Sequence, residues 1–156
     1  MKVRVMFCLA LLCFFCSVFA QSTQDEKAII ALVNKAYQAL LDRDWETYAD
    51  TWAHEKTASR IGISGEDVSE LNGWENIEEM YLTGLKNNPE PGKTVFEYRN
   101  FTILVKDDIA WAAFDKYLKV ENEMEKRTRE YRRLIKQEGV WKVLTLMHVS
   151  QREADE

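Results

Sequence analysis

Apolar residues follow helical spacing in the first half of the chain. Over residues 23–40 they recur every three or four positions, which predicts a long amphipathic helix. A shorter helix is expected after Asp44, because aspartate often caps helix starts, and a third helix is expected over residues 74–85. Between these two helices, residues 57–63 have the pattern of a short strand. We expect residues 64–73, which contain two glycines, to form a loop.

The second half alternates between apolar and polar residues, which is the spacing of β-strands. Four strands are expected, over residues 93–105, 109–120, 128–137 and 140–150. In the first of them the alternation changes phase near Arg99 and Asn100, and an offset of one residue moves side chains to the opposite face. We therefore predict a β-bulge at this point that bends the strand strongly.

The order of these elements indicates the fold class. Helices that precede a run of antiparallel strands are typical of an α+β fold rather than an α/β fold. We expect three N-terminal helices packed on one face of a strongly bent, mostly antiparallel sheet. Such an arrangement leaves a concave space between helices and sheet, where a ligand pocket could form.

Residues 1–20 are predicted to be a signal peptide rather than part of the fold. Lys2 and Arg4 precede an apolar run that ends in small residues suited to cleavage after Ala20. A single membrane anchor is the alternative, although the run is short for a transmembrane span. We expect one exported domain over residues 21–156, periplasmic or secreted, without membrane contact after cleavage.

Composition excludes several kinds of site. All three cysteines lie in the predicted signal peptide, so the mature chain has neither disulfides nor thiolate nucleophiles. The whole chain has a net charge of −5 at pH 7, and removal of the basic N-terminus makes it more negative, which argues against nucleic acid as a partner. Two separated histidines give no metal signature, and we expect neither a metal nor a cofactor.

Four segments, in order, carry a resemblance to a known family. They are LLDRDWETYADTW at 40–52, GWENIEEMY at 73–81, DDIAWAAFDKY at 107–117 and EGVWKVLTLMHVS at 138–150. Together they resemble the nuclear transport factor 2-like superfamily, in particular its SnoaL-like and ketosteroid-isomerase-like small domains, over nearly all of residues 25–151. The resemblance implies a cone-shaped α+β barrel with a pocket at its open end. It also implies a sheet whose outer surface often forms a dimer.

The strand over residues 128–137 carries much charge for a strand beside a core. Because side chains alternate, Arg132 and Glu130 share a face with Leu134, and the other arginines lie on the opposite face. Either orientation brings an arginine to the concave side. The family resemblance favours Arg132, which falls where related kinase association domains carry a pocket arginine. Its guanidinium needs a carboxylate from Glu130, from Asp115 or from an anionic ligand, so an internal ion pair and a ligand contact remain alternatives.

Two residues are candidates for acid/base catalysis. His148 could transfer a proton near neutral pH, and Asp115 is the second candidate, on one strand face with Tyr117 and Trp111. The simpler interpretation of each is a hydrogen-bonded structural residue. Asn100 also begins an Asn-Phe-Thr sequon, which matters only in an organism that glycosylates exported proteins. The predicted ligand-binding residues are Arg132, Glu130, His148, Tyr117, Trp111 and Trp52.

Three functions are compatible with these sequence features. The first is an exported domain that binds a small molecule in a cone-shaped cavity, an anionic one if Arg132 is the anchor. The second is a homo-oligomeric interaction module without a ligand, dimeric through the outer face of the sheet. The third is an enzyme with cofactor-independent acid/base chemistry of the isomerase, cyclase or dehydratase type. Catalysis ranks last, because no nucleophile–base pair or phosphate-binding loop is visible.

Overall fold

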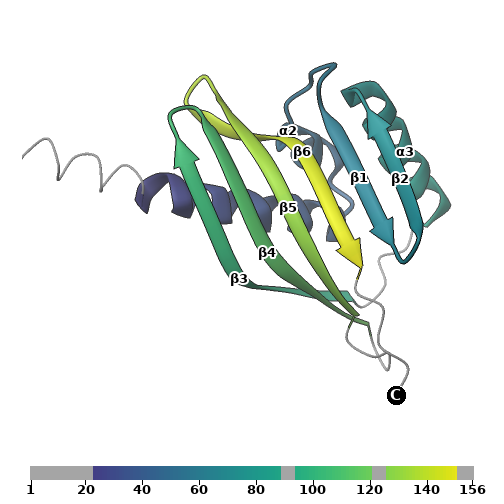
Figure 1. The fold of residues 1–156 in the computed structure, drawn as a ribbon. Helices are drawn as coiled ribbons and strands as arrows, with labels where there is room; N and C mark the ends of the chain where they lie inside the picture. The colour runs from purple at the N-terminus through teal and green to yellow at the C-terminus, as the bar shows by residue number, and fades with distance from the viewer. Residues whose placement is uncertain (1–22, 89–93, 121–125, 151–156) are drawn as a thin grey trace, which may run out of the picture.

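The computed structural model describes residues 23–88, 94–120 and 126–150. The predicted signal peptide at residues 1–20 lies outside these ranges. The α+β class is confirmed, with three helices on one face of a curved six-stranded sheet (Figure 1). Within the described ranges, no helix is both long and apolar enough to cross a membrane.

The helices match the predicted segments. The first covers residues 23–41, and it is followed by α2 (Trp45–Asp50) and, after two strands, by α3 (Trp74–Asn87). Asp44 caps α2 as expected, because its Oδ1 atom accepts a hydrogen bond from the backbone N–H of Thr47 at 3.0 Å.

The sheet is mixed, with one parallel pair of strands. The strands are β1 (Ser59–Ser64), β2 (Asp67–Asn72), β3 (Thr94–Lys106), β4 (Ile109–Val120), β5 (Lys126–Gln137) and β6 (Val140–Ser150). Their order across the sheet is β2-β1-β6-β5-β4-β3. β1 and β6 run parallel, and every other neighbouring pair is antiparallel. The sheet curves without closing, so β2 and β3 are its two edges (Figure 1).

The prediction of a loop over residues 64–73 is wrong, because most of this segment forms strand β2. β2 pairs antiparallel with β1 through a turn in which Gly65 has a φ of 62°. Five of its six residues are exposed, since it is an edge strand that buries neither face. A strand of this kind is held by backbone hydrogen bonds and needs no apolar alternation, so a hydrophobic pattern does not reveal it.

Two register shifts bend the sheet. The predicted bulge in β3 is confirmed, because the pairing with β4 shifts around Asn100, whose φ is 57°. A second shift, which the sequence did not suggest, lies in β6 opposite Leu134 of β5. There β6 contains one extra residue, and both Val143 and Leu144 are buried.

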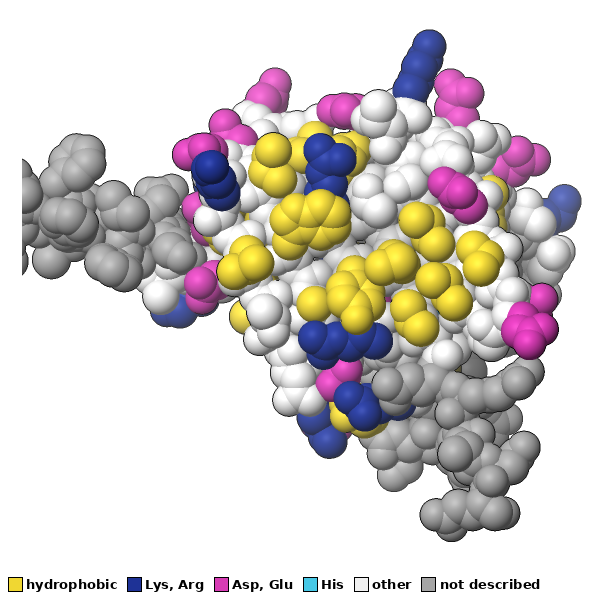
Figure 2. Space-filling model, viewed as in Figure 1, with side chains coloured by type: hydrophobic (Ala, Val, Ile, Leu, Met, Phe, Trp, Pro, Cys, Tyr) yellow, Lys and Arg dark blue, Asp and Glu magenta, His cyan; other side chains and the backbone are white. Residues whose placement is uncertain are grey.

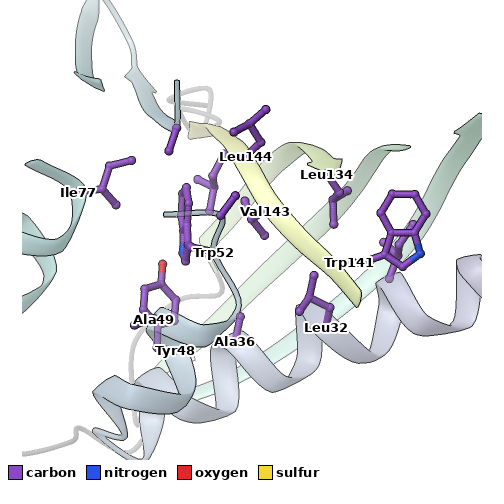
Figure 3. Close-up of a cluster of buried hydrophobic side chains, with 14 of the residues drawn as sticks. Leu32, Ala36, Tyr48, Ala49, Trp52, Ile77, Leu134, Trp141, Val143 and Leu144 are labelled. Carbon is purple, nitrogen blue, oxygen red and sulfur yellow. The ribbon is translucent and has the colours of Figure 1, made fainter. Parts of the chain in front are cut away.

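The hydrophobic core lies between the helices and one face of the sheet, which we call the inner face. Figure 3 shows Leu32 and Ala36 of the first helix directed toward β6, which contributes Val143, and Tyr48 of α2 directed toward Trp52. We call the opposite face of the sheet, which none of the described helices covers, the outer face (Figure 1). The two faces give the charged residues of the sheet two different environments.

Candidate functional site

Arg132 of β5 faces the helices. Its exposed fraction is 2%, and Glu130 and Leu134, on the same side of the strand, are 1% and 0% exposed. The residues that alternate with them are only partly buried or exposed. The charged strand therefore directs most of its cations outward and one arginine into the interior.

Glu130 is the centre of a buried polar network. Its Oε2 atom accepts a hydrogen bond from Nη2 of Arg132 at 3.1 Å, and its Oε1 atom lies 3.0 Å from Nζ of Lys116. The hydroxyl of Tyr37, on the first helix, also donates to Oε1. The guanidinium carbon of Arg132 lies 5.0 Å from the ring centroid of Tyr37 and 5.3 Å from that of Phe114. Aromatic rings thus cover the cation, and Glu130 is its carboxylate partner.

The charges of the network determine its protonation. Burial by itself raises the pKa of Glu130, but the charges of Arg132 and Lys116 outweigh burial and lower this pKa to about 2. Burial, and then the negative charge of Glu130, raise the pKa of Tyr37 well above its ordinary value. At neutral pH the network therefore contains two cations, one carboxylate and one neutral phenol.

Two donors of this region lack an acceptor among the described residues. They are the Nε atom of Arg132 and the hydroxyl of Tyr98, both buried. Tyr98 lies on β3 opposite Lys116, and its ring stacks on that of Tyr37 with centroids 4.9 Å apart. A buried donor without an acceptor costs roughly 1–3 kcal/mol, so both atoms favour the binding of a group that supplies one.

His148 of β6 lies on the inner face beside this network. Its Cα partner on β5 is Glu130, and its ring lies against Gly62 of β1, where an added Cβ would be 2.9 Å from Cε1 of His148. Burial, followed by the charges of Arg60 and Lys116, lowers the pKa of His148, so the imidazole is neutral at pH 7. A neutral imidazole can accept a hydrogen bond or a proton.

Asp115 of β4 faces away from the helices and is separated from Arg132 by the sheet. Its Oδ2 atom accepts hydrogen bonds from Asn100 at 2.7 Å and Arg127 at 3.0 Å, and its Oδ1 atom accepts one from Arg129 at 3.0 Å. These side chains cover the carboxylate, which is only 1% exposed. Burial raises its pKa, but the three hydrogen bonds prevail and lower it. Asp115 is therefore an ionised, hydrogen-bonded residue of the outer face.

The predicted aromatic residues lie apart from the Arg132 network. Trp111 is 53% exposed on the outer face. Tyr117 lies on the same face, with the guanidinium carbon of Arg99 4.7 Å from its ring centroid. Trp52 is 3% exposed within the main hydrophobic core (Figure 3). Trp111 and Tyr117 point outward because the alanines and the phenylalanine that alternate with them on β4 fill the inner side.

Sequence reasoning did not identify Lys116, Tyr37 or Tyr98 as members of the site. Lys116 follows the buried Phe114 by two positions on β4, so strand alternation was a usable signal for it. Tyr37 is 93 residues from Glu130. Its contact depends on how the first helix crosses the sheet, which no local pattern reports.

A separate surface cleft of about 440 Å³ opens where α3 begins. His54, Lys56, Asn72 and Trp74 are among its lining residues, and the His54 ring stacks on Trp74 with centroids 4.2 Å apart. None of the residues predicted from the sequence to form a site lines this cleft. Across the described ranges, no cluster of three His, Cys, Asp or Glu side chains is arranged to hold a metal ion.

Sequence comparison points to one family. A profile of the SnoaL-like domain matches residues 29–151, which is most of the chain. A search of curated proteins gave no match.

Several solved structures share the fold at low sequence identity. A nuclear transport factor 2-like protein of unknown function from Pseudomonas putida has a TM-score of 0.69 and 18% identity, covering 85% of this chain and 91% of that chain. A candidate dehydratase of the same family from Streptomyces avermitilis has a TM-score of 0.68 and 13% identity, with coverage of 83% and 98%. A candidate calcium/calmodulin-dependent protein kinase type II association domain from Thiobacillus denitrificans has a TM-score of 0.65 and 13% identity, with coverage of 78% and 94%. At these identities the likeness shows the fold alone.

Proposed function

The chain belongs to the SnoaL-like domain family, and on this basis we propose that it binds a small anionic molecule on the inner face of its sheet. Arg132 is the anchor of the proposed site, and Lys116 and the hydroxyl of Tyr98 are further donors. The observation that carries the proposal is that one carboxylate, Glu130, serves two cations in the interior.

The charge balance explains why an anion would bind there. The side chains of Arg132 and Glu130 are 2% and 1% exposed, and that of Lys116 is 18% exposed. Two cations and one carboxylate leave a net positive charge where water solvates it poorly, and an anion from outside would neutralise that charge. If the anion is a carboxylate, one of its oxygens could accept a hydrogen bond from Nε of Arg132, which has no acceptor among the described residues.

Solvent reaches the inner face from one end of the strands. Around Arg132 the neighbouring Ala112 and Leu146 are almost completely buried. Further along the same strands, Lys116, Thr128 and His148 are only partly buried. A small molecule that enters at this end would meet Lys116 first and Arg132 at the bottom of the site.

Isothermal titration calorimetry with a panel of small carboxylic acids tests the proposal. Arg132→Gln is expected to weaken binding roughly tenfold or more, because a charge-assisted hydrogen bond is lost. Lys116→Gln tests the same site through a less buried residue, should Arg132→Gln fail to fold. Arg133→Gln, on the outer side of the same strand, is the matched control and should bind like wild type. Equal affinities for all four proteins would overturn the proposal.

Proton transfer by His148 is a second candidate function. It is supported by the position of His148 on the inner face and by the lowered pKa of its imidazole. NMR titration should give a pKa for His148 below its ordinary value of 6.5, and binding of an anion beside it should raise this pKa. A measured pKa above 7 that does not respond to anions would exclude His148 as a neutral base.

We also propose that two copies associate through their outer faces. Figure 2 shows apolar side chains gathered over this face of the sheet. Leu104, Trp111 and Val140 are 69%, 53% and 54% exposed there, which favours a protein partner. Trp111→Glu should convert a dimer to a monomer in analytical ultracentrifugation. Leu82→Glu, at an exposed position of α3, should leave the dimer intact. A monomeric wild-type protein would contradict this proposal.

The proposal that the protein is exported rests on its first 20 residues. Lys2 and Arg4 followed by the apolar run to Ala20 support a signal peptide that is removed during secretion. Mass spectrometry of the protein from the periplasm or the medium should find Gln21 at the N-terminus. A chain that remains in the cytoplasm and keeps Lys2 would refute export.

A further inference from the structure

Arg60 of β1 is a second arginine on the inner face. Its Cα pairs with that of Leu146, which also pairs with Arg132, so the two arginines lie in one row on either side of β6. The guanidinium carbon of Arg60 lies 5.9 Å from the ring centroid of Tyr81 on α3. Its Nε atom is buried without an acceptor, and Arg60 forms no ion pair within the described ranges.

The inner face therefore carries an excess of positive charge around His148. Arg132, Lys116 and Arg60 are cations, and Glu130 is the one carboxylate paired with any of them in the described part of the chain. His148 is neutral at pH 7 and offsets none of this charge. Three cations and one carboxylate leave two positive charges, of which a monoanion would neutralise only one.

The two arginines are separated by neutral groups. Two strand spacings lie between Arg132 and Arg60, which is about 10 Å between their Cα atoms. The sheet is curved, and both arginines project from the side that the helices cover (Figure 1). Leu146 lies between them in the same row and is almost completely buried, and the next row contains Glu130, His148 and Gly62. A ligand that reaches both cations would place an uncharged segment beside His148 and Gly62, the neutral members of that row.

We propose that the ligand of this site is a dicarboxylate, with one carboxylate at Arg132 and Lys116 and the other at Arg60. The inference rests on the proposed function and specifies its ligand. The first carboxylate accepts from Nε of Arg132, and the second accepts from Nε of Arg60. The carbon chain between them passes the ring of His148, which is only partly buried. Two carboxylates would neutralise the two uncompensated charges and supply both missing acceptors.

Calorimetry with matched ligands tests whether Arg60 binds a second carboxylate. Glutarate and its monoamide differ by one negative charge at nearly the same size, and succinate and adipate vary the distance between the carboxylates. Wild type should bind the preferred diacid roughly tenfold or more tightly than the corresponding monoamide. Arg60→Gln should largely remove this preference, because it weakens binding of the diacid more than binding of the monoamide. Arg133→Gln should behave like wild type.

The outcomes separate this inference from the proposed function. If wild type binds diacids and monoamides equally, or if Arg60→Gln weakens both alike, the dicarboxylate inference is overturned. Loss of binding for both ligand types in Arg132→Gln would then still support the proposed function. If wild type binds none of these acids, both are overturned. The wild-type comparison needs no variant, and circular dichroism shows whether Arg60→Gln is folded.

Discussion

Replacing Glu130 by glutamine should destabilise the domain strongly. The substitution keeps the shape of the side chain but leaves Arg132 and Lys116 without their carboxylate. Removing one partner of a buried ion pair typically costs about 3–5 kcal/mol. That is a large part of the roughly 5–15 kcal/mol that stabilises a domain of this size.

The pKa of Glu130 gives an independent magnitude. Arg132, Lys116 and Tyr37 lower this pKa from its ordinary value of 4.5 to about 2, against the effect of burial. A difference of this size corresponds to roughly 3 kcal/mol. Because the pKa is lower in the folded state, the contribution is fully present above pH 4.5 and is lost as the pH falls toward 2. The pKa and the cost of an unpaired buried charge thus predict similar losses.

Urea unfolding followed by tryptophan fluorescence measures the effect. At pH 7 the free energy of unfolding of Glu130→Gln should lie about 3 kcal/mol below that of wild type. This difference in the free energy of unfolding should become smaller as the pH falls below 4.5, because only wild type has a carboxylate at position 130 that becomes protonated. Other acidic groups titrate in both proteins, so the difference between the two isolates Glu130. Glu97→Gln, at an exposed position of β3, is the control and should leave unfolding unchanged.

Two results would refute this reasoning. One is a loss of less than about 1 kcal/mol at pH 7, which would mean that Glu130 is no more important than an exposed ion-pair residue. The other is a constant difference between the two proteins across the acid range. A double variant, Glu130→Gln with Arg132→Met, should recover part of the lost stability, because it removes the unpaired guanidinium.

Two further predictions concern backbone positions. Gly62→Ala should destabilise the domain by about 1–3 kcal/mol in urea unfolding, because the new Cβ would lie 2.7 Å from the Oγ atom of a neighbouring serine and 2.9 Å from the His148 ring. Gly84→Ala, in α3 with no atom near the new Cβ, should instead stabilise by about 0.5–1 kcal/mol, and a destabilised Gly84→Ala would show that the contacts are not the cause. Asn100→Ala should destabilise by about 1–3 kcal/mol, because the positive φ becomes strained and Asp115 loses a hydrogen bond. Asn100→Gly should lose less, since it removes only the hydrogen bond, and equal thermal midpoints for the two variants would contradict the contribution of φ.

The strands that bury one face could be predicted from the sequence, and the strand that buries neither face could not. Burial enforces alternation, so the four-strand meander and the bulge at Asn100 were visible as patterns. The hairpin at Glu138 and Gly139 was visible for the same reason, and their φ values of 51° and 81° suit a tight two-residue turn. β2 escaped detection because its stability comes from backbone pairing at the sheet edge.

The site was only partly predictable, because strand alternation fixes faces but not partners. The sequence placed Arg132 and Glu130 on one face with Leu134, and the complete burial of Leu134 shows that this face is the inner one. Alternation could not choose between Glu130 and Asp115 as the partner, since both are within reach of β5 arginines. It also could not show that the first helix brings Tyr37 to Glu130.

The parallel pairing of β1 with β6 affects the order in which the domain can fold. The side chains of Ser59 and Thr145, which are hydrogen-bonded to each other, are 86 residues apart in sequence. Strands β3 to β6 are consecutive and can pair with little loss of loop entropy, whereas β1 must close a long loop to reach β6. In pulse-labelled hydrogen exchange during refolding, amides of β4 and β5 should therefore gain protection before those of β1. Arg60 would join the other inner-face cations only in this last step, so the ability to bind ligand would report that the chain has finished folding.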